Sequence, residues 1–188
     1  FDSVAMRPIA GAAVQAVARD APDGPVHTAV TDASGHYELR LPRARYLLAF
    51  AHTTLDSLGV KLAALPVDVT DGGQVVGNLA VPSPQRIVST LCGPASEEIG
   101  AIVGFLRDAR TGIPVDTGTV EGSWHELTIR KGAMRYEEIG AVARVRPDGW
   151  FTLCGVAPKG EAFITASRAR DSTGAVLLSI PEHGLVRR

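Results

Sequence analysis

Three residues of this 188-residue chain have the side chains of a hydrolase triad: His52, Asp56 and Ser57. A triad needs a nucleophile, a base and an orienting acid that converge on one point. These three lie on one short stretch that reads as a strand and its following turn, where side chains alternate in direction. The Asp-Ser pair also recurs at residues 171–172 without the histidine. The spacing favours turn capping, and we expect no catalytic residue and no enzyme.

Metal-binding patterns are equally weak. The five histidines stand singly: His27, His36, His52, His125 and His183. Their spacings are not those of a zinc site. The acidic turns at Asp32 and Asp148 each bring one carboxylate, whereas calcium takes roughly six to eight oxygen ligands. The acidic pairs at residues 97–98 and 137–138 read as solvated loops. We therefore expect no metal and no cofactor.

Two cysteines, Cys92 and Cys154, are the complete thiol content. Neither belongs to a CxxC pair, which argues against zinc or redox chemistry. The alternatives are a disulfide formed in an oxidising compartment, which we predict, and two buried free thiols. On the chain-entropy model, closing a loop of this length stabilises a fold by about 4 kcal/mol.

The charges of the chain nearly cancel, with 19 Lys and Arg against 20 Asp and Glu. A nucleic-acid surface needs clustered cations to replace phosphate counterions, so we expect no nucleic-acid partner. Hydrophobic residues make up 45% of the chain, which is enough for a packed core. No apolar run approaches the roughly 20 residues of a membrane helix, so we expect no membrane span in this segment.

Strand patterns dominate the chain. Apolar residues alternate with other residues in six stretches, at residues 36–41, 65–69, 75–81, 99–105, 141–145 and 176–180. A period of two places every second side chain on a core face, and Gly, Pro, Asp and Asn interrupt the runs, which predicts an all-β fold. The exception is a predicted helix over residues 84–91. Ser83 can cap its start, and Gly93 can end it.

The pattern of the first half returns in the second half. Matching residues recur at an offset of 106 and then of 114: Asp2 with Asp108, Pro8 with Pro114, Ile9 with Val115, Val14 with Val120, Gly35 with Gly149, Tyr37 with Phe151, and Leu39 with Leu153. The change of offset requires an insertion, much of it within residues 121–140, where we expect an interaction specific to the second copy. The sequence therefore predicts two copies of a unit of roughly 90 residues.

Each copy has the same type of turn before an aromatic-rich strand. Asp32 and Gly35 form it in the first copy, and Asp148 and Gly149 form it in the second. An Asp side chain accepts hydrogen bonds from backbone N–H groups ahead of it, and Gly takes the positive φ of a tight hairpin. We predict that these four residues have a structural role.

The order of these motifs resembles the carboxypeptidase regulatory-like domain. The residues that carry the resemblance are Asp2, Pro8-Ile9-Ala10-Gly11-Ala12, Val14, Thr31-Asp32, Gly35-His36-Tyr37, Leu41-Pro42 and Tyr46-Leu47-Leu48, and in the second copy Asp108, Pro114-Val115 and Asp148-Gly149. The resemblance implies a transthyretin-like (prealbumin-like) sandwich, a non-catalytic accessory of secreted, periplasmic or cell-surface bacterial proteins. Relatives of this fold bind sugars or form covalent Lys–Asn bonds. Because Asn78 is the only asparagine, at most one copy could carry such a bond.

Three aromatic residues form the candidate binding surface: Trp124, Tyr136 and Trp150. The repeat aligns Trp150 with His36, which the alternation places on the outward face of its strand. An outward tryptophan serves as a contact between domains, a contact between subunits or a platform for a sugar.

These observations predict two tandem seven-strand Greek-key sandwiches, transthyretin-like and immunoglobulin-like, at residues 1–91 and 92–188, with the helix at residues 84–91 as linker. In the second copy, residues 100–106 read as a first strand that the first copy lacks. The last strand of the second copy, at residues 185–188, is short. Both features predict open sheet edges.

The predicted function is structural: a non-catalytic module of an extracellular, cell-surface or periplasmic protein that contacts other proteins, including copies of itself. Strands supplied by neighbouring chains would join such copies into a filament. Truncated or disordered ends are the other interpretation of the open edges. The alternative function is a carbohydrate-binding accessory module with the aromatic rings as its platforms.

Overall fold

The structure is a computed structural model that describes residues 1–94 and 99–188. The acidic pair at residues 97–98 therefore lies outside the described residues. No helix in the described part of the chain has both the length and the apolar character needed to cross a membrane.

The described chain forms two compact units. The first consists of Phe1–Asp56 and Lys61–Ser83, and the second of Ser57–Val60 and Pro84–Arg188. The helix predicted at residues 84–91 forms as α2 (Pro84–Cys92). Its apolar face, with Ile87 and Val88, is buried, as the spacing of these side chains requires. This helix belongs to the second unit, whereas the sequence boundary after residue 91 grouped it with the first half.

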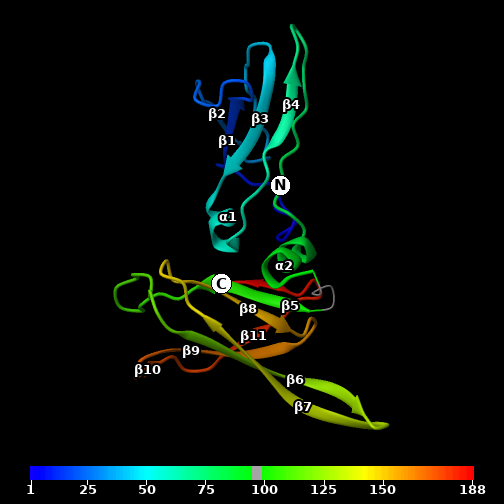
Figure 1. Cartoon of the computed structure of the whole chain (residues 1–188), viewed down its shortest axis with the longest axis vertical. Helices are drawn as coiled ribbons and strands as arrows, with labels where there is room; N and C mark the ends of the chain where they lie inside the picture. Colours follow the sequence, from blue (N-terminus) through cyan, green and yellow to red (C-terminus); the bar gives the residue numbers. More distant parts are fainter. Residues whose placement is uncertain (95–98) are drawn as a thin grey trace. The chain divides into compact units, whose positions relative to one another are not determined.

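The first unit is built on one antiparallel sheet of four strands in the order β2-β1-β3-β4 (Figure 1). Its strands are β1 (Ala13–Ala18), β2 (His27–Val30), β3 (Ala44–Ala51) and β4 (Leu65–Val69). Alternate side chains of β1 and β3 point to one face of the sheet and form the centre of the core. The buried members of this core are Val14, Ala16, Tyr46 and Leu48.

Two stretches that the sequence predicts as strands do not form strands in the first unit. Residues 36–41 and 75–81 lie in no ladder, although Leu39 and Leu79 pack against the core of the sheet. A strand exists only through a hydrogen-bonded neighbour, and the described residues of the first unit place no strand between these two segments. The chain also forms a short helix, α1 (Thr53–Leu58), where we predicted a turn.

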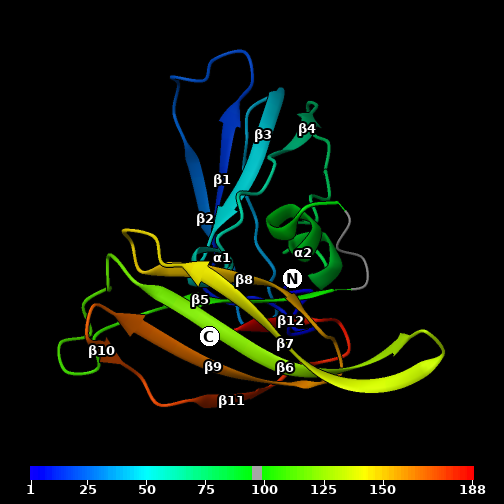
Figure 2. The ribbon, with the colours of Figure 1, turned by 60° about the horizontal axis from the view of Figure 1, so that its bottom comes forward.

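The second unit is a sandwich of two sheets (Figure 2). The larger sheet has the order β10-β9-β6-β7, with β11 beside β9, and the smaller has the order β12-β5-β8. The strands are β5 (Gly100–Phe105), β6 (Thr119–Arg130), β7 (Ala133–Arg144), β8 (Trp150–Val156), β9 (Glu161–Arg168), β10 (Asp171–Ser172), β11 (Val176–Ser179) and β12 (Leu185–Arg187). The predicted all-β class is confirmed.

Both units use one strand order and the same turn hydrogen bonds. The order β2-β1-β3-β4 of the first unit matches β7-β6-β9-β11 of the second. The Gly35 N–H donates to the carbonyl of Asp32 at 3.0 Å, and the Gly149 N–H donates to that of Arg146 at 2.8 Å. The second unit differs by having β5, in which all residues but the last are buried.

The predicted disulfide between Cys92 and Cys154 is confirmed. It joins the end of α2 to β8, with 5.7 Å between the two Cα atoms and a sequence separation of 62. Both cysteines belong to the second unit, so the bond closes a loop within one folded body. A cross-link of this kind limits the conformations of the unfolded chain.

Replacing both Cys92 and Cys154 by Ala should lower the free energy of unfolding of the second unit by about 4 kcal/mol. Both tryptophans of the chain, Trp124 and Trp150, lie in this unit, so tryptophan emission during urea unfolding reports on it alone. Reduced wild-type protein is the matched control and should unfold like the double variant. If the double variant unfolded at the same urea concentration as oxidised wild type, a stabilising role for the disulfide would be contradicted.

Candidate strand-binding groove

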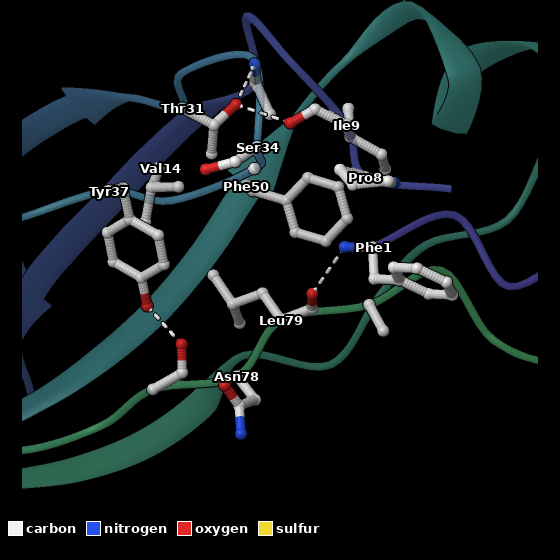
Figure 3. Close-up of a pocket in the computed structure, with 14 residues that line it drawn as sticks. Phe1, Pro8, Ile9, Val14, Thr31, Ser34, Tyr37, Phe50, Asn78 and Leu79 are labelled. Atoms are coloured by element: carbon white, nitrogen blue, oxygen red, sulfur yellow. Dashed lines mark hydrogen bonds between the residues drawn. The ribbon is translucent and has the colours of Figure 1, made fainter. Parts of the chain in front are cut away.

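A groove crosses the apolar face of the first unit, between residues 34–41 and 72–80. Figure 3 shows the part of it that Phe50 and Leu79 line. The groove consists of a cavity of about 250 Å³ and an adjoining one of about 730 Å³. Phe50 and Val14 line the smaller cavity from the sheet, and Leu79 lines it from the opposite segment. The groove is therefore walled by two chain segments and floored by the sheet.

The side chains of this groove are less buried than their counterparts in the second unit. Tyr37 and Leu39 are half-buried, whereas Phe151 and Leu153, at the matching positions, are only 8% and 1% exposed. In the second unit, β5 pairs with the strand that carries these two residues. The sequence repeat aligns this strand with residues 35–39, which border the groove of the first unit.

The backbone of the groove wall is also open. Within the described residues, no backbone hydrogen bond joins residues 37–41 to a neighbouring segment. The corresponding strand of the second unit, β8, pairs with β5 from Trp150 to Val156. An open row of N–H and C=O groups is a template for pairing with another chain.

Phe1 makes the hydrogen bonds at one end of the groove. Its amino group donates to the carbonyl of Leu79 at 2.9 Å, and its carbonyl accepts a bond from the N–H of Val81 at 2.8 Å. In the second unit, β12 pairs in parallel with β5 in the same manner, from Leu185 with Ala101 onward. Phe1 thus makes two hydrogen bonds of a parallel pair with residues 79–81.

Tyr37 ties the two walls of the groove together. Its hydroxyl donates a hydrogen bond to the carbonyl of Gly77 at 2.5 Å (Figure 3). Burial raises the pKa of the Tyr37 phenol, because the charged phenolate is poorly solvated there. Asn78 lines the groove beside this bond, and no lysine is among the described residues that line it.

The first predicted turn lies at the edge of the groove. Asp32 Oδ1 accepts hydrogen bonds from the hydroxyl of Ser34 at 2.7 Å, the N–H of Ser34 at 2.8 Å and the N–H of His36 at 2.9 Å. The bond from the Ser34 hydroxyl, followed by that from the His36 N–H, lowers the pKa of the Asp32 carboxyl. Gly35 has a φ of 77°, which only glycine adopts without strain.

The second predicted turn has similar geometry in the other unit. Asp148 Oδ1 accepts a bond from the N–H of Trp150 at 3.1 Å, and Gly149 has a φ of 81°. A Cβ atom at Gly149 would lie 2.8 Å from the carbonyl oxygen of Leu106. This close approach gives a second reason for glycine at the position.

The three predicted aromatic residues do not form one surface. Trp124 is 3% exposed and its indole donates to Glu126 at 2.7 Å, while Tyr136 is 72% exposed and its ring stacks on His125 at 5.0 Å. Trp150 lies outside the core cluster that holds its neighbours Phe151 and Leu153, in line with the predicted outward face, but its side chain is only 6% exposed because Gly59 packs against the ring. The guanidinium of Arg146 covers its ring at 5.0 Å from the centroid.

The residues with triad side chains lie at α1. His52 precedes the helix, and its Nδ1 accepts a hydrogen bond from the N–H of Thr54 at 3.2 Å. Asp56 and Ser57 lie within the helix. The imidazole therefore caps a helix start, which is a structural use of the histidine.

Sequence reasoning predicted an open sheet edge that a strand from a neighbouring chain could fill, and it identified the alternation of Tyr37 and Leu39. It did not identify the residues that line the groove. Nothing in the sequence indicated that Phe50 and Asn78 line a binding site, because neither residue belongs to a motif. The sheet topology alone brings these two residues to the same cavity.

Comparisons with known proteins give only distant likenesses. No family model and no curated protein matches the chain. Among solved structures, the Bacillus anthracis TIE protein is similar over 100% of this chain and 32% of its own, with 11% identity and a TM-score of 0.35. A streptococcal ancillary pilin is similar over 100% of this chain and 59% of its own, with 17% identity and a TM-score of 0.34.

A mutant of the shaft pilin SpaA from Lactobacillus rhamnosus GG is similar over 96% of this chain and 91% of its own. The identity is 14% and the TM-score 0.33. This chain spans less than two thirds of the TIE protein and of the ancillary pilin. At these TM-scores the likenesses assign neither a family nor a function to this chain.

The Tyr37 hydroxyl should make the first unit sensitive to alkaline pH. Because its folded pKa is raised, the unfolded chain loses the phenolic proton first, so stability is complete below about pH 10 and falls as the pH rises further. Urea unfolding followed by far-ultraviolet circular dichroism should show this fall. Tyr37→Phe should remove this loss of stability at alkaline pH. Tyr136→Phe, which changes an exposed ring, should leave the loss as it is in wild type. Equal pH profiles for wild type and Tyr37→Phe would show that the bond to Gly77 has no such effect.

Proposed function

We propose that this chain is a non-catalytic structural module that binds other proteins by accepting an extended strand into the groove of its first unit. The observation that supports this most directly is that β8 pairs with β5 in the second unit, whereas residues 37–41, which the sequence repeat aligns with β8, pair with no strand and border an open groove. We also propose that the two units are copies of one transthyretin-like sandwich, in line with their common strand order and turns. On this proposal, a bound strand pairs with residues 37–41 and 75–81 and forms a second, smaller sheet with them.

The direction of the bound strand is inferred from the second unit. There, β5 runs antiparallel to β8 and parallel to β12. The bound strand should therefore run antiparallel to residues 37–41 and parallel to residues 75–81. Its carboxyl end then lies next to Phe1, where the ladder along Leu79 begins.

The residue types expected in the bound strand are also inferred from the second unit. Ala101, Ile102 and Val103 of β5 are fully buried, so the bound strand should be apolar. Gly104 lies opposite Phe151, and a Cβ atom there would lie 3.2 Å from its ring and 2.5 Å from a backbone carbonyl oxygen. The matching position faces Tyr37, so the strand should carry its smallest residue there.

The proposed donor is a neighbouring protein chain, and serial donation would produce a filament. Strand addition supplies main-chain hydrogen bonds, while side-chain pockets give specificity. A head-to-tail contact that does not close on itself propagates without limit. We propose an extracellular, cell-surface or periplasmic location, supported by the Cys92–Cys154 disulfide, since such bonds persist in oxidising compartments.

Carbohydrate binding is the second candidate, and one observation favours it. Tyr136 is exposed and stacks on His125, which gives an open ring of the kind that sugars stack against. Trp124 and Trp150 are buried and offer no open ring face. We therefore prefer protein binding.

A peptide with the sequence of residues 100–107, carrying a dye at its amino end, tests the groove. Fluorescence anisotropy with the 188-residue protein should show saturable binding. Leu79→Glu should weaken binding about tenfold or more, because the strand would bury an unpaired carboxylate. Val30→Glu is the matched control, since Val30 is 64% exposed on β2 and lines neither cavity, and it should bind like wild type.

Two further measurements make this test decisive. A peptide with Gly104→Val should bind more weakly than the parent, because the added side chain meets the ring of Tyr37. Fusing residues 100–106 directly before Phe1 should fill the groove within one chain and abolish peptide binding. Absence of saturable binding, or equal binding by folded Leu79→Glu protein, would contradict the groove proposal. Uniform monomers of native protein in electron micrographs would contradict the filament.

A further inference from the structure

The β6–β7 hairpin extends beyond the rest of its sheet (Figure 2). β6 pairs with β7 along its whole length, Thr119 to Arg130, but it pairs with β9 only as far as Ser123. Residues 124–139 therefore form a two-stranded arm. A hairpin of two strands is marginally stable in water unless a further strand or layer supports it.

One face of this arm is apolar and exposed. Residues directly opposite each other in an antiparallel pair share a face, so Leu127 with Tyr136 and Ile129 with Met134 form one continuous strip. The exposed fractions of these four side chains are 63%, 72%, 73% and 69%. Exposed apolar surface gathered in this way marks a contact with another molecule.

β7 is an edge strand, the last in the order β10-β9-β6-β7. It contains no proline or lysine, and its register with β6 is continuous over all twelve residues, so it has no bulge. Of the features by which proteins prevent edge strands from pairing, its arm has only charged side chains: Arg135, Glu137 and Glu138.

Charge on the arm favours one way in which two copies of β7 can pair. Antiparallel pairing about a two-fold axis at Tyr136 places Arg135 opposite the second copy's Glu137, and the reverse, on the face away from the apolar strip, and it places Met134 opposite the second copy's Glu138 at the end of the strip. An axis at Arg135 or at Glu137 would instead place like charges opposite each other, which is destabilising. A two-fold axis that passes between two neighbouring residues of β7 would pair a residue that points to one face of the sheet with a residue that points to the other face, which a regular antiparallel pair does not allow.

We infer that two copies of this chain associate through the β7 edges of their arms, antiparallel and centred on Tyr136. The larger sheets of the two second units then become one continuous sheet. The apolar strips of the two arms meet on one face of it, and two Arg135–Glu137 ion pairs form on the other. The interface uses the second unit alone and does not depend on the groove.

A single cysteine at the axis tests the register. Directly opposite Cα atoms in an antiparallel pair lie about 4.5–5.5 Å apart, within the range of a disulfide. Because the described cysteines are both in a disulfide, Tyr136→Cys should form a covalent dimer on mild oxidation. Met134→Cys is the matched control on the same face, and the two copies of residue 134 would lie about 13 Å apart along the strands, so it should stay unlinked.

A charge exchange tests the ion pairs. By analytical ultracentrifugation, Arg135→Glu and Glu137→Arg should each raise the dimer dissociation constant about tenfold, because each replaces two attractive pairs by two repulsive ones. The double variant should return to within about threefold of wild type. Leu79→Glu, in the groove, should leave the dissociation constant unchanged. Monomeric wild type at all concentrations, equal cross-linking of both cysteine variants, or a double variant no better than the single ones would overturn the inference.

Discussion

Extended chain must place its backbone N–H and C=O groups against a neighbour or leave them to water, and the two units of this protein meet that demand differently. In the second unit, β5 lies between β8 and β12 and pairs with both. Its side chain Ile102 belongs to the core of the unit, and its neighbours Ala101 and Val103 are fully buried as well. In the first unit, residues 36–41 and 75–80 border a groove and stay outside any ladder.

The packing of the first unit follows from this difference. Its sheet buries Val14 and Leu48, but the side chains that face the sheet from across the groove, such as Leu39 and Leu79, remain half-buried. The bond from Tyr37 to Gly77 is a local substitute that holds the walls together where a strand would. Regions with few backbone bonds and partial burial are the first to open in a folded protein. The two walls of the groove are thus the least stable part of the first unit, and they also form its candidate binding site.

The sequence predicted what depends on local pattern and on covalent chemistry. The alternation of apolar residues indicated the all-β class, the capping residues around 84–91 indicated a helix, and two lone cysteines indicated a disulfide. It placed Trp150 on the face of its strand away from the core but did not predict its burial, because burial there depends on what packs over the ring, here Gly59 and Arg146. α1 was missed because the stretch around Asp56 has no apolar period of its own.

The alternation of Tyr37 and Leu39 is a true strand pattern, yet these residues form no strand. Alternation reports which side chains face a core, whereas strand formation also requires a hydrogen-bonded neighbour. That neighbour is a property of the fold and cannot be inferred from the segment itself. The groove is therefore visible only when the two units are compared.

Amide hydrogen exchange of the 188-residue protein tests most directly whether residues 37–41 are unpaired and accept a strand. With no added strand, the amides of residues 37–41 should exchange rapidly, while those of Ala101 to Val103 in β5 should be strongly protected. Saturating peptide with the sequence of residues 100–107 should slow exchange in residues 37–41 and leave β5 unchanged. Strong protection of residues 37–41 without added peptide, or no change on adding it, would contradict the account.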